Sequence, residues 1–314
     1  MLKVAIVGAG GIGSCLGAAL SSVAEVTLIC RGAHLAAIQK HGLSMVGPKG
    51  TTVYPLRATD RPSDVGTVDV IVSCVKLYDL EESTRLALPM IGSQTLIVPA
   101  QNGVTAHEQI GAIVGSERVL GGTVFMSASL LQPGLVKLRS PNASMTFGEL
   151  HGEPSARVRA WAELCEAGGI RAQVPDNILT FLWRKFIGLG GAAALSCLSR
   201  RTLGEIRVDP MLRRLLQEAM AEVLALAQAK KVEIDHSFLA EAMAFADSVS
   251  PDIKISILED LEAGKALELE WISGYIARES RAAGLSAPLN EIAYACTRHL
   301  ALGKSAGTKL TSST

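Results

Sequence analysis

A glycine-rich segment near the start of the chain has residue types and spacing suited to binding an anion. Gly8, Gly10 and Gly13 fall in "GAGGIG", with Gly11 and Ile12 between them. The first glycine allows a tight turn, the second lets the main chain approach a pyrophosphate, and the third lets a helix pack on a strand. The amides at the start of the helix then face the phosphates. We therefore expect this segment to bind a dinucleotide, although glycines alone also form simple turns.

The segments on either side of these glycines support the dinucleotide interpretation. "LKVAIV" at 2–7 is a short apolar run rich in β-branched residues, and "SCLGAAL" at 14–20 carries helix-forming residues. The predicted order is therefore strand, glycine turn, helix. This order is the context that a dinucleotide-binding turn requires.

The second predicted strand bears on which dinucleotide is bound. "EVTLIC" at 25–30 ends at Cys30 and is followed by Arg31, where an NAD site would have Asp or Glu for the ribose 2′-hydroxyl. A guanidinium instead pairs with the 2′-phosphate of NADP. The sequence thus predicts NADPH or NADP as cofactor. If Arg31 is incidental, an NAD-using dehydrogenase working towards oxidation is the alternative.

Two more polar residues follow apolar strands and should lie at the same edge of the sheet. Lys76 ends "VDVIVSCVK", and Asn102 follows "TLIVPA" within "QNG" at 101–103. Ligands of open α/β sheets collect at the carboxyl ends of the strands. Lys76 could add a second cation near the phosphates or be an ordinary solvated residue. Asn102 should open onto the same crevice, although Asn-Gly also simply favours turns.

Lys185 heads a run that is otherwise almost free of polar groups, "WRKFIGLGGAAALS" at 183–196. The ordinary interpretation is a surface lysine whose stem packs on apolar neighbours while its ammonium reaches water. Other segments of the sequence are needed to distinguish that interpretation from a catalytic role for Lys185.

The remaining segments predict two domains of different class. Strand-like runs at 119–149, separated by Pro133-Gly134 and by residues 140–142, suggest hairpins that close one edge of the sheet. From Asn177 to about residue 301 almost every segment has helical periodicity. We expect an α/β fold with an N-terminal Rossmann-type dinucleotide-binding domain at 1–174, an all-helical C-terminal domain at 175–303, and a disordered tail at 304–314.

The amino-acid composition limits which binding partners and which cellular compartment we expect. The 314 residues carry 30 basic and 30 acidic side chains, which gives no reason to expect nucleic acid or an anionic membrane as partner. The six cysteines are scattered without metal-ligand spacing, so we expect no metal site and a reducing cytoplasm. The apolar run at Lys185 is taken as too short to span a bilayer. Extended apolar faces in the helical half favour a homodimer.

Taken together, these motifs resemble the ketopantoate reductase family, the 2-dehydropantoate 2-reductases, across nearly the whole chain. The matching segments are "GAGGIG" at 8–13, "CR" at 30–31, "VK" at 75–76, "QNG" at 101–103, "WRK" at 183–185, "SILEDLEAGKALELE" at 256–270 and "AAGLSAPLN" at 282–290. The resemblance implies an active site in the cleft between the two domains. There NADPH would deliver a hydride to C2 of a small 2-oxo acid, nominally ketopantoate, giving an R-2-hydroxy acid in pantothenate biosynthesis.

The resemblance also assigns roles to individual residues. Lys185 matches the catalytic lysine, which in a water-poor cleft would stabilise charge on the carbonyl oxygen and supply its proton, with a pKa lowered by burial. Glu268 matches the active-site glutamate that orients this lysine, although most glutamates are solvated. Ser256 matches a serine that contacts the substrate carboxylate, although with Glu259 it also spells a capping box. Asn102 matches the asparagine beside nicotinamide and substrate.

Two positions after Lys185 depart from the family pattern, and Ser273 also stands where the family usually has an asparagine before Gly274. Leu189 and Ala193 stand one and two turns beyond Lys185, where the family usually has substrate-binding asparagines. A polar substrate group buried there without a partner would lose about 1–3 kcal/mol. A reductase for a bulkier, more apolar 2-oxo acid is therefore an alternative, as is a non-catalytic NADP-binding module.

Overall fold

The chain folds into two compact units in a computed structural model that describes residues 1–47, 50–139 and 143–303. The first unit is Met1–Leu182 and the second is Trp183–Thr314, so the division falls inside helix α6 (Ile178–Ser199). The domain boundary expected between residues 174 and 175 stays a prediction. The expected tail at 304–314 and the expected turn at 140–142 lie outside the described residues.

A five-stranded parallel sheet forms the centre of the first unit. Its order is β5-β2-β1-β6-β7, and every neighbouring pair is parallel. The strands are β1 (Lys3–Val7), β2 (Glu25–Ile29), β5 (Arg57–Thr59), β6 (Val68–Ser73) and β7 (Ile91–Pro99). The helices that follow them are α1 (Gly11–Leu20), α2 (Gly32–His41), α3 (Leu80–Ala87) and α4 (Ala106–Val114). This order of strand and helix confirms the predicted Rossmann-like domain.

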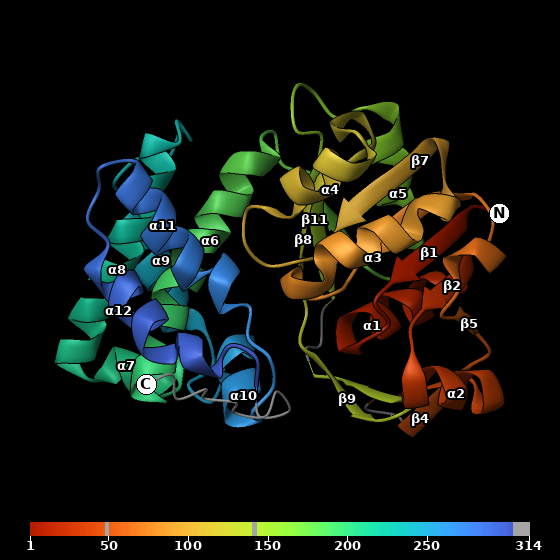
Figure 1. The fold of residues 1–314 in the computed structure, drawn as a ribbon, viewed down its shortest axis with the longest axis horizontal. Helices are drawn as coiled ribbons and strands as arrows, with labels where there is room; N and C mark the ends of the chain where they lie inside the picture. The colour runs from red at the N-terminus through yellow and green to blue at the C-terminus, as the bar shows by residue number, and fades with distance from the viewer. Residues whose placement is uncertain (48–49, 140–142, 304–314) are drawn as a thin grey trace, which may run out of the picture. The chain divides into compact units, whose positions relative to one another are not determined.

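Helices cover both faces of this sheet because successive strand side chains point to opposite sides. Ile6 faces α1, since a Cβ placed on Gly13 would lie 3.0 Å from its Cγ2. The next residue, Val7, instead lines a space with Thr84 and Ala87 of α3, which lies across the strands in Figure 1. A strand buried on both faces must be apolar along its buried part, as Val4–Val7 of β1 is after the exposed Lys3.

The strands at 119–149 are not members of this sheet, so the expectation that their hairpins close its edge is wrong, although Val119 at the start of this segment forms an isolated parallel bridge with Ile97 of β7. They belong to two further sheets, β4-β3-β10-β9 and β12-β11-β8. The strands are β3 (Leu43–Gly47), β4 (Gly50–Tyr54), β8 (Gly121–Phe125), β9 (Ala128–Gln132), β10 (Leu135–Leu138), β11 (Ser144–Gly148) and β12 (Arg171–Gln173). The predicted hairpin at Pro133-Gly134 does form, and β9 pairs antiparallel with β10. However, β10 also pairs parallel with β3, a partner far away in sequence that no local pattern reveals.

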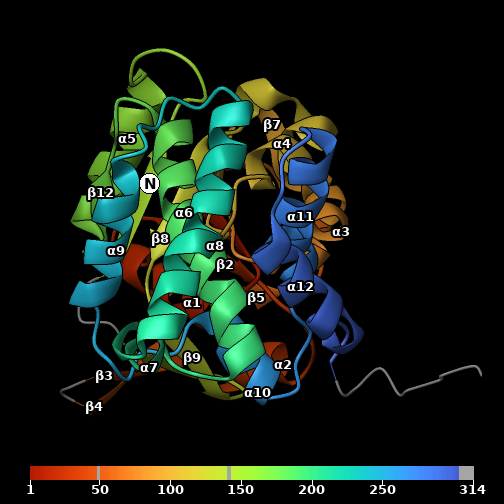
Figure 2. The same cartoon turned by 90° about the vertical axis from the view of Figure 1, so that its left-hand side faces the viewer.

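In the described residues 183–303, the second unit contains helices joined by loops and no strand. After α6 its helices are α7 (Leu203–Val208), α8 (Pro210–Ala229), α9 (Phe238–Ser248), α10 (Ser256–Glu262), α11 (Ser273–Ala282) and α12 (Pro288–Thr297). Figure 2 shows α6 beside α8. Gly191 permits this approach, because a Cβ there would lie 2.6 Å from Cγ of Met220 on α8. The predicted C-terminal helical domain is confirmed.

Helix α6 is longer than the sequence suggested. It has 22 residues and is long and apolar enough to cross a membrane by length and composition, so the expectation that the run is too short is wrong. However, 61% of its most apolar window is buried inside the protein. That burial is typical of the core helix of a soluble protein.

Candidate active site

The glycine turn after β1 has the geometry expected of its first and third glycines. Gly8 has φ +96°, and a Cβ there would lie 2.7 Å from the main-chain nitrogen of Val75. Its N–H donates to the carbonyl of Ile29 at 3.0 Å, which joins the turn to the end of β2. A Cβ on Gly13 would lie 2.2 Å from the carbonyl oxygen of Gly8. Both positions therefore require glycine for close packing of strand, turn and helix.

The second glycine faces open space. A Cβ on Gly10 would have no described atom within 4 Å, whereas one on Gly11 would lie 2.7 Å from the carbonyl oxygen of Ala128. Helical bonding begins with Ser14 N–H donating to Gly10 at 3.0 Å, so the amides of residues 11–13 precede the first such bond. Open space beside the first turn of a helix is where a pyrophosphate group can bind. The turn can therefore hold a dinucleotide.

A buried histidine, His34, which belongs to no motif of the sequence analysis, supports this turn. Nδ1 of His34 accepts a hydrogen bond from Gly134 N–H at 2.9 Å, so the proton is on Nε2, which lies 3.4 Å from Oγ of Ser14. Ser14 in turn donates to the carbonyl of Ala9 at 2.9 Å. Burial lowers the pKa of His34, which favours this neutral form. The chain of bonds fixes the glycine turn to α2 and to the β9–β10 hairpin.

Arg31 and Lys76 follow the strands on either side of β1. Arg31 precedes α2 with its side chain 81% exposed, and its Nη2 lies 3.8 Å from Oδ2 of Asp79. Lys76 is half-buried and precedes the short 3-10 helix η2 (Leu77–Asp79). The strand order β2-β1-β6 places the carboxyl ends of these strands side by side with the glycine turn. Asp79, which the sequence did not single out, thus adds an acidic group to this basic edge.

Asn102 and its neighbour Gln101 lie beyond β7, the next strand along the same edge. Asn102 is half-buried, and Gly103 after it has φ +89°. Gln101 is 5% exposed, and its side chain bonds to Ala100 just after β7, to Ser73 at the end of β6 and to Val75 beyond β6. The structure therefore brings the segments that carry Lys76 and Asn102 together. Gln101 lay inside the matched "QNG" segment, but its burial had no signal of its own.

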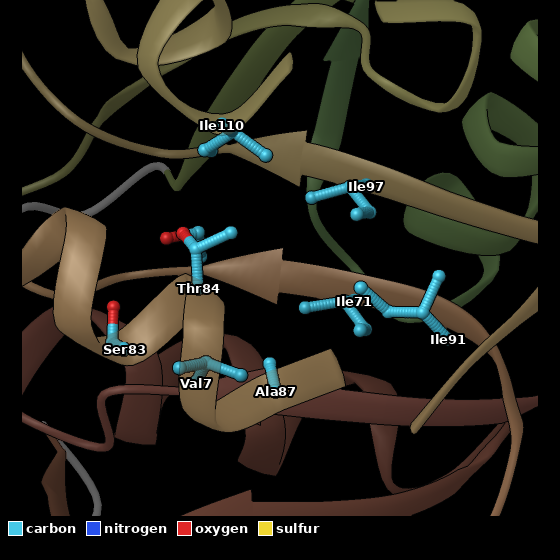
Figure 3. Close-up of a pocket in the computed structure, with 9 residues that line it drawn as sticks. Val7, Ile71, Ser83, Thr84, Ala87, Ile91, Ile97 and Ile110 are labelled. Atoms are coloured by element: carbon cyan, nitrogen blue, oxygen red, sulfur yellow. The ribbon is translucent and has the colours of Figure 1, made fainter. Parts of the chain in front are cut away.

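A cavity under α3 is part of the packing of the sheet and does not offer a polar site. Figure 3 shows Val7, Ile71 and Ile97 of the sheet near Thr84 of α3. The hydroxyl of Thr84 donates to the carbonyl of Leu80 at 2.7 Å, so it is already bonded. The wall of the cavity is otherwise mainly apolar.

In the second unit, Lys185 lies in the first half of α6 and is half-buried. Desolvation lowers its pKa from 10.5 to about 7, the direction that its sequence context predicted. Nearby on α6, the rings of Trp183 and Phe186 have centroids 5.8 Å apart, and both contact the ring of Tyr275 in α11. By contrast, Arg184 is exposed and packs over the ring of Phe238 at 5.2 Å. Of these adjacent cations, Lys185 has the perturbed acid strength needed for proton transfer near neutrality.

Glu268 and Ser256 belong to the same unit, and the ordinary alternatives for both are wrong. Glu268 is 7% exposed, just before the short 3-10 helix η5 (Leu269–Trp271) that precedes α11, so it is not a solvated residue. Ser256 is exposed and is the first residue of α10, whose N-cap is Ile255 without a described side-chain capping bond. The capping box expected with Glu259 therefore does not account for Ser256. Their roles towards a substrate stay predictions.

The two positions without the family's asparagines also lie on α6. Leu189 is half-buried, and Ala193 is 1% exposed. Both side chains are apolar, so neither can form a side-chain hydrogen bond. Among the described residues, no group of three or more His, Cys, Asp or Glu side chains could hold a metal.

The Rossmann-like unit and the helical unit with its half-buried lysine are typical of a dinucleotide-dependent oxidoreductase. The chain belongs to the ketopantoate reductase family. The family model "Ketopantoate reductase PanE/ApbA" matches residues 4–152, and the corresponding C-terminal model matches residues 177–301.

Individual relatives cover nearly the whole chain. The 2-dehydropantoate 2-reductase of Mesorhizobium japonicum is 28% identical over 96% of this chain and 98% of its own length. A solved PanE/ApbA family ketopantoate reductase from Ralstonia eutropha JMP134 is 26% identical, with TM-score 0.87, over 96% of this chain and 98% of that chain. D-mandelate dehydrogenase, solved with NADH and anilino(oxo)acetate, is 25% identical, with TM-score 0.87, over 96% of this chain and 100% of that chain.

These findings establish the class of enzyme. The chain is an oxidoreductase of the 2-dehydropantoate 2-reductase type, from a family that reduces 2-oxo acids and binds NAD(P)H.

Proposed function

We propose that this protein uses NADPH to reduce a 2-oxo acid, nominally 2-dehydropantoate, to the R-2-hydroxy acid. The observation that carries the proposal is Lys185, a half-buried lysine whose pKa burial lowers to about 7. A lysine with this pKa is protonated in a large fraction of molecules at neutral pH and still releases its proton readily. NADPH, when bound, supplies the hydride.

Residues of the first unit would hold the cofactor. The main-chain amides of Gly10, Gly11, Ile12 and Gly13 would donate to the pyrophosphate, and Gly8 shapes the turn. Arg31 would pair with the 2′-phosphate, since the end of β2 carries no carboxylate in "EVTLIC". Lys76 and Asn102 follow neighbouring strands and would contact the phosphates and the nicotinamide, respectively.

Residues of the second unit would act on the substrate. Lys185 would donate a hydrogen bond to the carbonyl oxygen, stabilise the charge that develops there and transfer its proton. Glu268, a nearly buried acidic residue, would orient Lys185 and the polar groups of the substrate. The exposed hydroxyl of Ser256 would donate to the substrate carboxylate, with Asn102 contributing to the same substrate.

The test is NADPH oxidation with ketopantoate, comparing wild type with Lys185→Ala. Arg184→Ala is the matched control, because it removes the adjacent, exposed cation of the same helix. We expect kcat to fall about 10²–10⁴-fold for Lys185→Ala and to change little for Arg184→Ala. Calorimetry first confirms that all three proteins bind NADPH. Tight NADPH binding without turnover of any 2-oxo acid would instead support the non-catalytic binding module.

The apolar residues on α6 favour a second candidate substrate. Leu189 and Ala193 offer no hydrogen bond to a polar substrate, and one structural relative is a D-mandelate dehydrogenase. A 2-oxo acid with a bulkier apolar side chain, such as phenylglyoxylate, would be accepted without an unpaired polar group. Comparing kcat/KM for ketopantoate and phenylglyoxylate in wild type and Leu189→Asn separates the two. A higher value for ketopantoate in wild type would rule out the apolar substrate.

The cellular location, the oligomeric state and the binding partner of the protein are also proposals. A cytoplasmic location and a homodimer are the sequence-based expectations, and a small-molecule 2-oxo acid is the expected partner. Six cysteines without a disulfide in the structure agree with a reducing compartment.

A further inference from the structure

The side chain of Gln101 is buried at the carboxyl end of β7 and makes three hydrogen bonds. Its Oε1 accepts from Ala100 N–H at 3.1 Å. Its Nε2 donates to Oγ of Ser73 at 2.9 Å and to the carbonyl of Val75 at 3.1 Å. The main-chain carbonyl of Gln101 also accepts from Oγ1 of Thr123 at 3.1 Å. A side chain that is 5% exposed thus has both of its polar atoms satisfied.

These bonds join two segments that carry proposed site residues. Ser73 ends β6, and Val75 directly precedes Lys76. On the other side, Gln101 is followed at once by Asn102. The regular strand pairing ends close by, with Ala100 N–H donating to the Ser73 carbonyl at 2.9 Å. Beyond that point the side chain of Gln101 takes over the connection between the two strands.

We infer that Gln101 is a positioning residue that sets the places of Lys76 and Asn102 relative to each other. The inference rests on the proposed function for the roles of these two residues, but its geometry rests on the three side-chain bonds alone. A shift of either segment would displace a group that contacts the cofactor, and misplacement of about 1 Å can cost about 100-fold in rate.

The chemistry of this position requires an amide. Oε1 meets an N–H donor, whereas Nε2 meets the Val75 carbonyl, which can only accept. A glutamate would keep the first bond but place a second oxygen against that carbonyl. A methionine has a similar length and volume but supplies none of the three bonds. The two substitutions therefore test hydrogen bonding with little change in size.

The matched control is Thr95, in the middle of β7. Thr95 is 2% exposed, and its Oγ1 donates to the Val68 carbonyl at 2.6 Å and accepts from Gly92 N–H at 2.8 Å. Thr95→Val therefore breaks one buried bond to the first residue of β6 and one buried bond within β7, away from Lys76 and Asn102. It should destabilise the unit to a similar degree without moving either residue.

The experiment compares Gln101→Glu, Gln101→Met and Thr95→Val with wild type. We measure Tm, calorimetric Kd for NADPH, kcat and KM, and hydrogen exchange of residues 74–76 and 102–103 in the free protein. We expect all three variants to lower Tm. The Gln101 variants alone should weaken NADPH binding about tenfold or more, lower kcat and speed exchange in both segments. Equal Kd, kcat and exchange in the Gln101 and Thr95 variants would overturn the inference.

Ser73→Ala keeps the test decisive if both Gln101 variants fail to fold. It removes one of the three bonds, so we expect a smaller change in the same direction, about threefold in Kd. An unchanged Kd and unchanged exchange would count against positioning. If wild type itself does not bind NADPH, the proposed function fails, and the exchange comparison in the free protein still decides whether Gln101 positions the two segments.

Discussion

The guanidinium of Arg31 approaches the carboxylate of Asp79, with Nη2 and Oδ2 3.8 Å apart. The two side chains are 81% and 39% exposed, so the pair contributes little to folding stability. Its consequence is electrostatic, because a cofactor phosphate that pairs with Arg31 would also meet the negative charge of Asp79.

Replacing either member of this pair should change the preference between the two nicotinamide cofactors. Arg31→Ala removes the cation for the 2′-phosphate, and we expect NADPH affinity to fall about tenfold or more while NADH affinity changes little. Asp79→Asn removes a repelling charge, so NADPH should bind a few-fold tighter at low salt, and the gain should shrink at high salt.

Calorimetric titration with both cofactors measures these effects, and Glu81→Gln is the control. Glu81 is an exposed acid of the same unit that pairs with Arg85 within α3. An unchanged cofactor preference in Arg31→Ala would favour the NAD-using alternative. A gain for Glu81→Gln equal to that of Asp79→Asn would show a general charge effect with no special role for Asp79.

The rate of reduction should depend on the protonation of Lys185. Burial places its pKa at about 7, and the proposed general acid must be protonated to react. We therefore expect kcat/KM for reduction to be level below that pKa and to fall about tenfold per pH unit above it. Lys185→Arg keeps its charge at every accessible pH, so its residual activity should lack this decline. A pH profile of kcat/KM that stays level up to about pH 9 would contradict the assignment.

The ionisation of Lys185 should affect folding stability in the opposite direction: the rate of reduction falls as pH rises, whereas the contribution of Lys185 to stability rises. The folded pKa of Lys185 is about 7, below its ordinary value, so the unfolded chain binds more protons between about pH 7 and about pH 10. The contribution of Lys185 to stability therefore rises with pH across this window. Urea unfolding of wild type and Lys185→Met should show the stability difference shifting in favour of wild type as pH rises. A difference independent of pH would mean that burial does not shift this lysine.

The sequence predicted those elements whose signals lie in consecutive residues. The run at 2–7, the glycine turn and the following helix are consecutive, so their order and the packing of Gly13 against Gly8 followed from adjacent residues. The helical second unit followed in the same way from 3.6-residue periodicity. Lys185 could be singled out because its apolar neighbours adjoin it in sequence.

Features that depend on distant strand pairing could not be predicted. The bond between His34 and Gly134 joins residues 100 positions apart, and Gln101 reaches Ser73 across 28 positions. Nothing near either residue marks it as buried. Ser256 shows that a local pattern can also mislead. Its S-x-x-E pattern predicts a capping residue, yet Ser256 is the first residue of α10 and Ile255 is at the N-cap.

The glycine turn offers a final test in which two similar substitutions should affect different properties, cofactor binding in one case and folding stability in the other. A Cβ on Gly10 would meet no described atom within 4 Å, and Gly10 has an extended backbone with a negative φ of −70°. Gly10→Ala should therefore fold with nearly unchanged Tm but weaken NADPH binding about tenfold or more, because its methyl group enters the space for the pyrophosphate. A Cβ on Gly13 would lie 2.2 Å from the carbonyl oxygen of Gly8, so Gly13→Ala should lower Tm strongly. Thermal unfolding and calorimetry of both variants measure this contrast. Normal NADPH binding by Gly10→Ala would show that the pyrophosphate does not lie against this turn.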